Sequence, residues 1–267
     1  NKANEGHYSK HQIAKPLYTV EQAKQVFPLF RVVKVNEVVN LDAEIEAFFT
    51  NAGHIIGACT IDLMIENKKL ISAVLLLTFF VFIWSAVQPH DYLTWFLEVV
   101  PAIIGFSLIF YFRKSFSISN FLLILICMHS VVLFIGGHYT YAEVPIGNWV
   151  KDFFHLSRNH YDRLGHFFQG FEPVFLAREI FIRHHVVKNK GWSYFLAISV
   201  CLAFSAFYEL IEFATAVVLG STSDAFLGTQ GDIWDTQKDM LMALIGAISS
   251  ILFFKWHDQS IDMKKHT

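Results

Sequence analysis

The pattern of apolar and polar positions changes at about residue 70. Before that point, short alternating runs such as residues 29–35 (Leu-Phe-Arg-Val-Val-Lys-Val) predict strands, and one helix is expected around residues 21–26. After it come six apolar runs, at residues 70–87, 93–112, 120–137, 164–182, 192–219 and 240–256. About 20 helical residues cross the hydrocarbon core of a bilayer, so these runs predict about six transmembrane helices. The expected fold class is an all-α integral membrane protein preceded by a short α/β fragment.

Three regions are therefore expected: residues 1–69 as the fragment, 70–258 as a six-helix membrane domain, and 259–267 as a polar cytoplasmic tail. Composition agrees, because 54% of the residues are hydrophobic and only 16% are charged, against about 25% charged in soluble domains. The expected partner is the lipid bilayer. A net charge of -2 predicts no nucleic-acid partner. The three cysteines, Cys59, Cys127 and Cys201, have no paired spacing, which argues against a disulfide framework or a zinc knuckle.

Lysine and arginine in the short connections predict the orientation, because they concentrate on the cytoplasmic side. With six spans, one side carries ten of them: Lys68, Lys69, Arg113, Lys114, Arg183, Lys188, Lys190, Lys255, Lys264 and Lys265. The other side carries four: Lys151, Arg158, Arg163 and Lys238. We therefore expect a multi-pass protein of the bacterial inner (plasma) membrane with both termini in the cytoplasm.

Ionisable residues inside spans are costly, and here they form stripes rather than a scatter. At helical spacing, such stripes place their side chains on one face of each helix. The three stripes, all toward the outer end, are Asp162, His166, Gln169 and Glu172; Glu209 and Glu212; and Asp232, Asp235 and Asp239. His138, Glu143, His155 and His160 lie in the adjoining outer segment.

Carboxylates gathered in this way repel one another unless some are protonated or a cation lies among them. Magnesium, calcium or manganese would suit the oxygen-rich set, and a histidine also allows zinc or iron. The spacing is not the Glu-x-x-His pattern of di-iron bundles. The competing interpretation is structural: the acids cap helices and pair with Arg158, Arg163, Arg178 and Lys238. Glu98 and His129 sit singly in their spans and are expected to bond to neighbouring helices, whereas Ala243 and Gly246 predict close helix packing.

The leading functional hypothesis is metal-assisted chemistry on a lipid-linked or amphiphilic substrate. The candidate cation ligands are Asp162, His166, Asp232, Asp235 and Asp239, with Glu209 or Glu212 as the general base. The other polar site residues would be His138, Glu143, His160 and Gln169. One alternative is a transporter or ion-coupled channel, with a path past Glu172 or Glu98. A second alternative is a structural or sensor protein without catalysis.

Four segments between about residues 75 and 258 resemble an uncharacterised bacterial inner-membrane family, the YjdF-like proteins. They are residues 136–145 (Gly-Gly-His-Tyr-Thr-Tyr-Ala-Glu-Val-Pro), 157–170 (Ser-Arg-Asn-His-Tyr-Asp-Arg-Leu-Gly-His-Phe-Phe-Gln-Gly), 207–212 (Phe-Tyr-Glu-Leu-Ile-Glu) and 227–240 (Leu-Gly-Thr-Gln-Gly-Asp-Ile-Trp-Asp-Thr-Gln-Lys-Asp-Met). The resemblance implies an inner-membrane location and carries no assigned activity.

A more distant likeness is to VanZ-like membrane proteins, which are linked to glycopeptide resistance and the cell envelope. Residues 162–166 (Asp-Arg-Leu-Gly-His) match the first motif of that family. Glu212 stands where the second motif has Gln, and Ala243 where the third has Asn.

The N-terminal region resembles a different family, the β-CASP nucleases of the metallo-β-lactamase fold, which process RNA. The likeness rests on residues 8–12 (Tyr-Ser-Lys-His-Gln), 16–21 (Pro-Leu-Tyr-Thr-Val-Glu) and 51–57 (Asn-Ala-Gly-His-Ile-Ile-Gly), in which His54 matches a zinc ligand. The His-x-His-x-Asp-His motif of that family is absent from the sequence. Without those ligands zinc cannot be held, so residues 1–69 are expected to be a truncated, inactive fragment.

Overall fold

The computed structural model describes residues 18–42, 45–52, 59–65, 68–219 and 230–263. Its contacts divide the chain into two units, Asn1–Ile65 and Glu66–Thr267. The division falls four residues before the boundary expected from hydropathy. The two units are described separately below.

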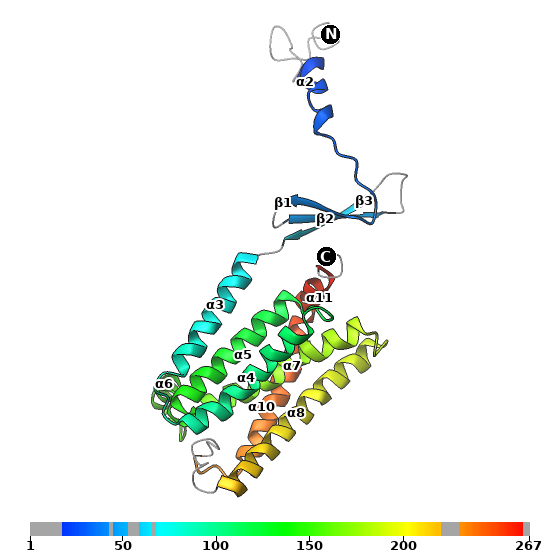
Figure 1. The fold of residues 1–267 in the computed structure, drawn as a ribbon. Helices are drawn as coiled ribbons and strands as arrows, with labels where there is room; N and C mark the ends of the chain where they lie inside the picture. The colour runs from blue at the N-terminus through cyan, green and yellow to red at the C-terminus, as the bar shows by residue number, and fades with distance from the viewer. Residues whose placement is uncertain (1–17, 43–44, 53–58, 66–67, 220–229, 264–267) are drawn as a thin grey trace. The chain divides into compact units, whose positions relative to one another are not determined.

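The described residues of the N-terminal unit form two short helical segments and a small sheet (Figure 1). Helix α2 (Val20–Lys24) starts with a capping box, in which Thr19 and Gln22 each bond the other's backbone N–H. The 3-10 turn η1 (Phe27–Leu29) follows. Strands β1 (Val38–Asp42), β2 (Ile45–Asn51) and β3 (Cys59–Ile65) form an antiparallel sheet in the order β1-β2-β3.

Residues 29–35 do not form the strand that their alternation predicts. Val32 is fully exposed, and residues 30–34 have no regular secondary structure. Alternation marks a strand only where one face is buried, and none of the elements among the described residues of this unit covers the run. The expectations for His54 and for residues 8–12 lie outside the described residues.

The second unit is a helical bundle (Figure 1). Its elements are α3 (Lys68–Ser85), α4 (Tyr92–Phe112), α5 (Asn120–Tyr139), η2 (Tyr141–Glu143), α6 (Pro145–Phe153), α7 (Tyr161–Arg183), α8 (Lys190–Leu219), α10 (Asp235–Ser249), η4 (Ser250–Phe253) and α11 (Phe254–Met263). All six predicted apolar runs are helical, and the last of them is divided among α10, η4 and α11.

Four of these helices are long and apolar enough to span a membrane by length and composition: residues 92–112, 120–139, 190–218 and 235–261. Helix α3 is a shorter apolar helix. Helix α7 is long enough, at 23 residues, but carries buried charges. This is the helical membrane architecture that the sequence predicts, whereas the number of spans, six, stays a prediction.

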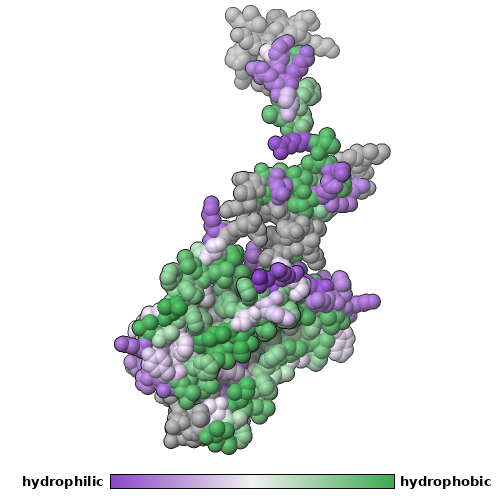
Figure 2. Space-filling model, in the orientation of Figure 1, coloured by the Kyte–Doolittle hydropathy of each residue, from purple (hydrophilic) through white to green (hydrophobic). Residues whose placement is uncertain are grey.

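Helix α7 lies at the centre of the bundle, where it contacts α5, α8 and α10, while α3 and α4 pack on α5. Its buried residues include Asp162, Arg163, Glu172, Arg178 and Glu179. The outer helices expose large apolar side chains instead, and Figure 2 shows hydrophobic residues over much of the visible face of this unit. A helical bundle in lipid is expected to bury its charged groups and to expose apolar groups on its surface, as this unit does.

Glycine residues allow α7 and α10 to pack so closely that their backbone atoms are in contact. A Cβ atom on Gly170 would lie 1.8 Å from the carbonyl oxygen of Ala243, and one on Gly246 would lie 2.1 Å from that of Phe167. The close packing predicted at Ala243 and Gly246 is confirmed. This contact fixes the distance between the two helices that carry the candidate site.

Candidate functional site

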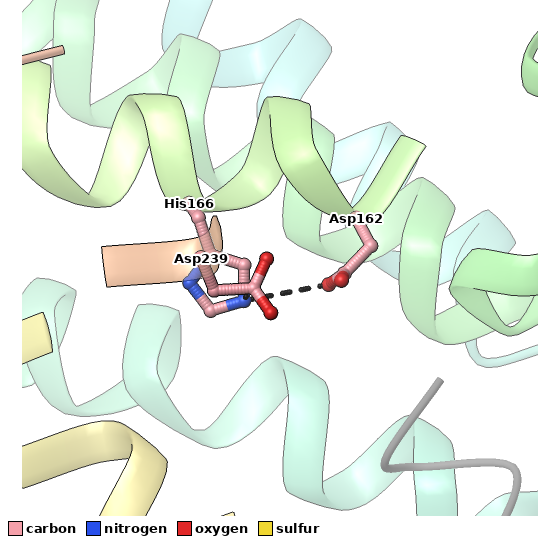
Figure 3. Close-up of side chains that lie close together, drawn as sticks. All are labelled: Asp162, His166 and Asp239. Atoms are coloured by element: carbon pink, nitrogen blue, oxygen red, sulfur yellow. Dashed lines mark ion pairs between the residues drawn. The ribbon is translucent and has the colours of Figure 1, made fainter. Parts of the chain in front are cut away.

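Asp162 and His166 on α7 and Asp239 on α10 come together near the start of both helices (Figure 3). His166 Nε2 lies 3.4 Å from Asp162 Oδ1 and 3.6 Å from Asp239 Oδ1. One ligand atom from each of the three residues lies within 4.8 Å of the others, and all three residues are buried. These donors are the oxygen and imidazole types that bind divalent cations.

Local sequence explains why these side chains converge. Asp162 and His166 are four residues apart, which places them one helical turn apart on the same face of α7. Asp162 lies in the first turn of α7, and Asp235 lies in the first turn of α10. Acidic groups are stabilised there by the helix dipole. Asp239 follows one turn after Asp235, so the face of α10 that meets α7 is acidic.

His166 has its two ring nitrogens in different surroundings. Nδ1 lies 2.9 Å from the side-chain oxygen of Gln169, whereas Nε2 faces the carboxylates of Asp162 and Asp239. Histidines that bind metals commonly donate their second ring N–H to such an oxygen, which orients the ring. Two carboxylates around Nε2 require a positive charge there, either a proton on the ring or a bound cation.

Two arginines border the cluster. Arg163 donates to Asp239, to Asp235 at 2.6 Å and to Asp232 at 3.3 Å. Arg158 donates to Asp235 and lies 3.7 Å from Asp162. The pairing of these acids with Arg158, Arg163 and Lys238, expected under the structural interpretation, is thus present.

Carboxylates nevertheless outnumber the fixed positive charges in this region. Four of them share Arg158, Arg163 and Lys238, namely Asp162, Asp232, Asp235 and Asp239. Glu209 is a further buried acid, 6% exposed, and its Oε1 has no hydrogen-bond partner in the described part of the chain. That oxygen lies 3.7 Å from His166 Nδ1. An unpaired buried carboxylate oxygen costs free energy unless a proton or a ligand satisfies it.

A small cavity of about 80 Å³ adjoins the cluster and is lined mainly by polar and ionisable residues, so we call it the polar cavity. It is large enough for water. Its walls come from α4, α5, α7, α8 and η2. They are formed by Glu98, Pro101, His129, Leu133, Tyr141, Asp162, Gly165, His166, Gln169, Tyr208 and Glu212. Sequence reasoning did not place Glu98, Tyr141 or Tyr208 at the site, although Tyr141 and Tyr208 lie within segments that carry the family resemblance.

The remaining residues predicted for this site lie elsewhere. His138 contacts the carbonyl oxygen of Ser85 and lines, with Glu143, a separate opening. His160 lies just before α7, where burial and the nearby Arg158 lower its pKa. Asp232 precedes α10, and the hydrogen bond from Lys238 lowers its pKa. None of these residues lines the polar cavity.

His129 confirms the expectation that it bonds to a neighbouring helix. Its Nδ1 lies 3.2 Å from Glu172 Oε2, which joins α5 to α7. Both residues are largely buried. This pair extends the polar residues from the Asp162–His166 region toward the middle of the bundle.

Comparison with known proteins identifies the family. Residues 70–259 match the family model described as a predicted membrane protein (DUF2238). The chain is 44% identical over 194 residues to the inner membrane protein YjdF of Escherichia coli strain K12, which covers 73% of this chain and 90% of that protein. No solved structure matches the chain. With the helical bundle and its apolar surface, these matches show that the chain belongs to the DUF2238 family of membrane proteins.

Proposed function

We propose that the protein is an enzyme of the bacterial inner membrane that uses a divalent cation to act on a lipid-linked or amphiphilic substrate. The observation that carries this proposal is the buried group of Asp162, His166 and Asp239, beside which Glu209 Oε1 lies 3.7 Å from His166 Nδ1 and accepts no hydrogen bond from the described residues. A purely structural network would be expected to supply a hydrogen bond to that oxygen. A cation at this position would neutralise the excess of carboxylates.

The geometry suggests a division of roles. Asp162, His166 and Asp239 bind the cation, and Gln169 orients the His166 ring through Nδ1. Asp232 and Asp235, predicted as ligands, position Arg158 and Arg163 instead, and Arg163 in turn holds Asp239. Glu209 or Glu212 would serve as the general base toward a water molecule at this site. A bound cation would supply the Lewis acidity that makes water a nucleophile at neutral pH.

The proposed topology has six spans with both termini in the cytoplasm, which follows from the lysine and arginine count. It places the start of α7 and of α10, and hence the site, near the outer face. Substrates made available at the outer leaflet or in the envelope would then reach it.

Metal content tests the proposal directly. The full chain would be purified in detergent with His54→Ala in every sample, so that the residue matching a zinc ligand of the nuclease family is removed. Elemental mass spectrometry would then compare this background with Asp162→Asn/His166→Ala and with Asp152→Asn. Asp152 is a matched control because its side chain is 77% exposed.

We expect about one metal ion per chain in the background and in Asp152→Asn, and none in the double variant at equal helical content. A metal-free background after reconstitution with magnesium, manganese and zinc would contradict the proposal. Equal metal content in the double variant would contradict it as well.

The alternative of an ion-coupled transporter requires a polar path from the site past Glu172 or Glu98. Both residues line cavities, which is the observation in its favour. The cavity that continues beyond Glu172 has mostly apolar walls, however, and such walls suit hydrocarbon better than ions. We therefore place the enzyme ahead of the transporter and of a purely structural or sensor role.

Residues 1–69 take no part in the proposed chemistry. We infer from the resemblance described above that they are an inactive nuclease fragment. The family match begins at residue 70, which fits a separate origin for this segment.

A further inference from the structure

A second cavity, of about 640 Å³, lies between α4, α5 and α7. It shares Pro101, His129 and Leu133 with the polar cavity, so the two adjoin. Its volume falls in the range of small-molecule sites, about 300–1,000 Å³. Most of its wall is apolar, including Ala102, Leu108, Ile109, Phe112, Ile126 and Leu176.

Most of the few polar groups in this wall are already paired, and the His184 ring stacks on Phe116 at one end of the cavity. Ser130 donates to the carbonyl oxygen of Ile126 at 2.7 Å, and Ser115 donates to that of Phe112. His129 and Glu172 bond to each other at the junction with the polar cavity. Satisfied polar groups make the wall effectively apolar, which favours a hydrocarbon ligand over water or an ion.

Gly105 gives independent evidence that this space is kept open. A glycine inside a helix costs about 1 kcal/mol relative to alanine, so it needs a reason. Close packing is not the reason, because a Cβ built on Gly105 would have no atom within 4 Å. Gly105 lines the apolar cavity, where its missing side chain widens the space.

The length of the cavity suits one hydrocarbon chain. Along α4 it runs from Pro101 to Phe112, which at 1.5 Å per residue is roughly 16 Å. One leaflet of a bilayer has a hydrocarbon thickness of about 15 Å, half of the full core. Leu108 is 51% exposed, so the wall is open to the surroundings of the bundle, where lipid would lie.

We propose that the apolar cavity binds the single hydrocarbon chain of an amphiphile whose polar head lies in the adjoining acid and histidine cavity. This inference rests on the proposed function and narrows its substrate class to single-chain amphiphiles or lipids that insert one chain. The His129–Glu172 pair marks the boundary between chain and head. An anionic head, such as a phosphate, matches a cation held by Asp162, His166 and Asp239.

The test uses dodecyl phosphate with a photoactivatable diazirine at the end of its chain. The full chain would be reconstituted in phosphatidylethanolamine vesicles, irradiated with the probe, and mapped by peptide mass spectrometry. The test variant is Gly105→Trp, which adds a large side chain to the cavity wall at a position where a Cβ atom would have no neighbour within 4 Å. The matched control is Ile104→Trp, because Ile104 is the neighbouring residue of α4, is 53% exposed and is not part of the cavity wall.

We expect adducts concentrated in α4 and the second half of α7, competed by unlabelled dodecyl phosphate. Gly105→Trp should reduce the number of adducts about tenfold or more. A tenfold loss of affinity corresponds to the burial of fewer than two methylene groups, and the Trp side chain would displace more of the probe than that. Ile104→Trp should leave them unchanged, and both variants should retain the helical content of the parent protein.

Adducts spread evenly over all lipid-facing helices would overturn the inference, as would equal labelling of Gly105→Trp and the parent. So would cross-links between two copies of the chain at Leu108, because a partner helix would then fill the space. Metal content separates this outcome from the proposed function. If the chain binds one metal ion but Gly105→Trp does not reduce the labelling, only the proposal of a hydrocarbon-chain site is refuted. If Gly105→Trp reduces the labelling but the chain binds no metal, only the proposal of an enzyme is refuted.

Discussion

The contact between α7 and α10 allows a quantitative prediction for Gly170→Ala. The new methyl group would lie 1.8 Å from the carbonyl oxygen of Ala243, whereas ordinary van der Waals contact begins at 3.4 Å. The opposing atom belongs to backbone, so no side chain can move aside. The two helices must therefore separate by about 1.6 Å in the neighbourhood of this contact.

Such a separation would reach the candidate site, because Gly170 lies one turn after His166. The distance from His166 Nε2 to Asp239 Oδ1 would grow from 3.6 Å to about 5 Å. A cation with bonds of about 2.0–2.2 Å cannot bridge donors more than about 4.4 Å apart. Overpacking of this kind costs about 1–3 kcal/mol, partly offset by up to about 1 kcal/mol of better helix propensity.

Thermal unfolding in detergent and metal content are the two assays. For a domain of 150–250 residues, 1 kcal/mol shifts the melting temperature by about 2–4 °C, so Gly170→Ala should melt several degrees below the parent and bind no metal. Gly105→Ala is the matched control, since its methyl group would meet open space. It should melt at or above the parent temperature and retain metal. If the two variants melt alike and both bind metal, the reasoning from helix contact to site geometry is wrong.

Two further predictions concern other parts of the bundle. Asp91 caps α4 by accepting the Thr94 N–H at 2.6 Å, and that bond lowers its pKa, so Asp91→Ala should cost about 1 kcal/mol in detergent unfolding at pH 7. Because the pKa of Asp91 is lower in the folded state, the stabilisation by its charge is present above the unfolded value of about 3.9 and is lost as pH falls through the folded value. Asp91→Asn should therefore match the parent only at pH values below the folded pKa, and a stability difference that does not change with pH would contradict this account. Glu179 is fully buried and accepts hydrogen bonds from Ser119 N and from His257 Nε2, so Glu179→Ala should cost about 3–5 kcal/mol. Unfolding by heat would measure this cost, and a loss below 1 kcal/mol would show that the charge is not needed.

Hydropathy located the helices because apolar runs of spanning length have few other uses. The polar stripes could likewise be predicted from the sequence, since helical spacing alone places Asp162 and His166 on one face of a helix. The strand predicted for residues 29–35 was wrong because alternation indicates a strand only when a neighbouring element buries one of its faces.

What remained hidden depended on contacts between helices. Nothing in the local sequence of His129 indicates Glu172 as its partner, 43 residues later. Gly105 and Gly170 have the same residue type and opposite roles, one opening a cavity and the other allowing contact. Glu98 also looked isolated, and only the folded structure shows that it lines the polar cavity together with residues of α7 and α8.

The buried charges of α7 have a consequence for how the protein is assembled in the membrane. Insertion of an Arg or Asp at the centre of a spanning helix costs about 2.5–3.5 kcal/mol, and α7 buries Arg163, Arg178 and Glu179 among others. Several partners that offset these costs arrive later in synthesis: Asp239 for Arg163, Asp258 for Arg178, and His257 for Glu179. As a span, α7 would therefore gain its full set of partners only after the C-terminal helices have emerged from the ribosome. Loss of the last thirty residues would remove these three partners and leave, among the described ion pairs, only Asp232 and Asp235 for Arg163 and Arg183 for Glu179, so truncated chains should integrate less well and be degraded early.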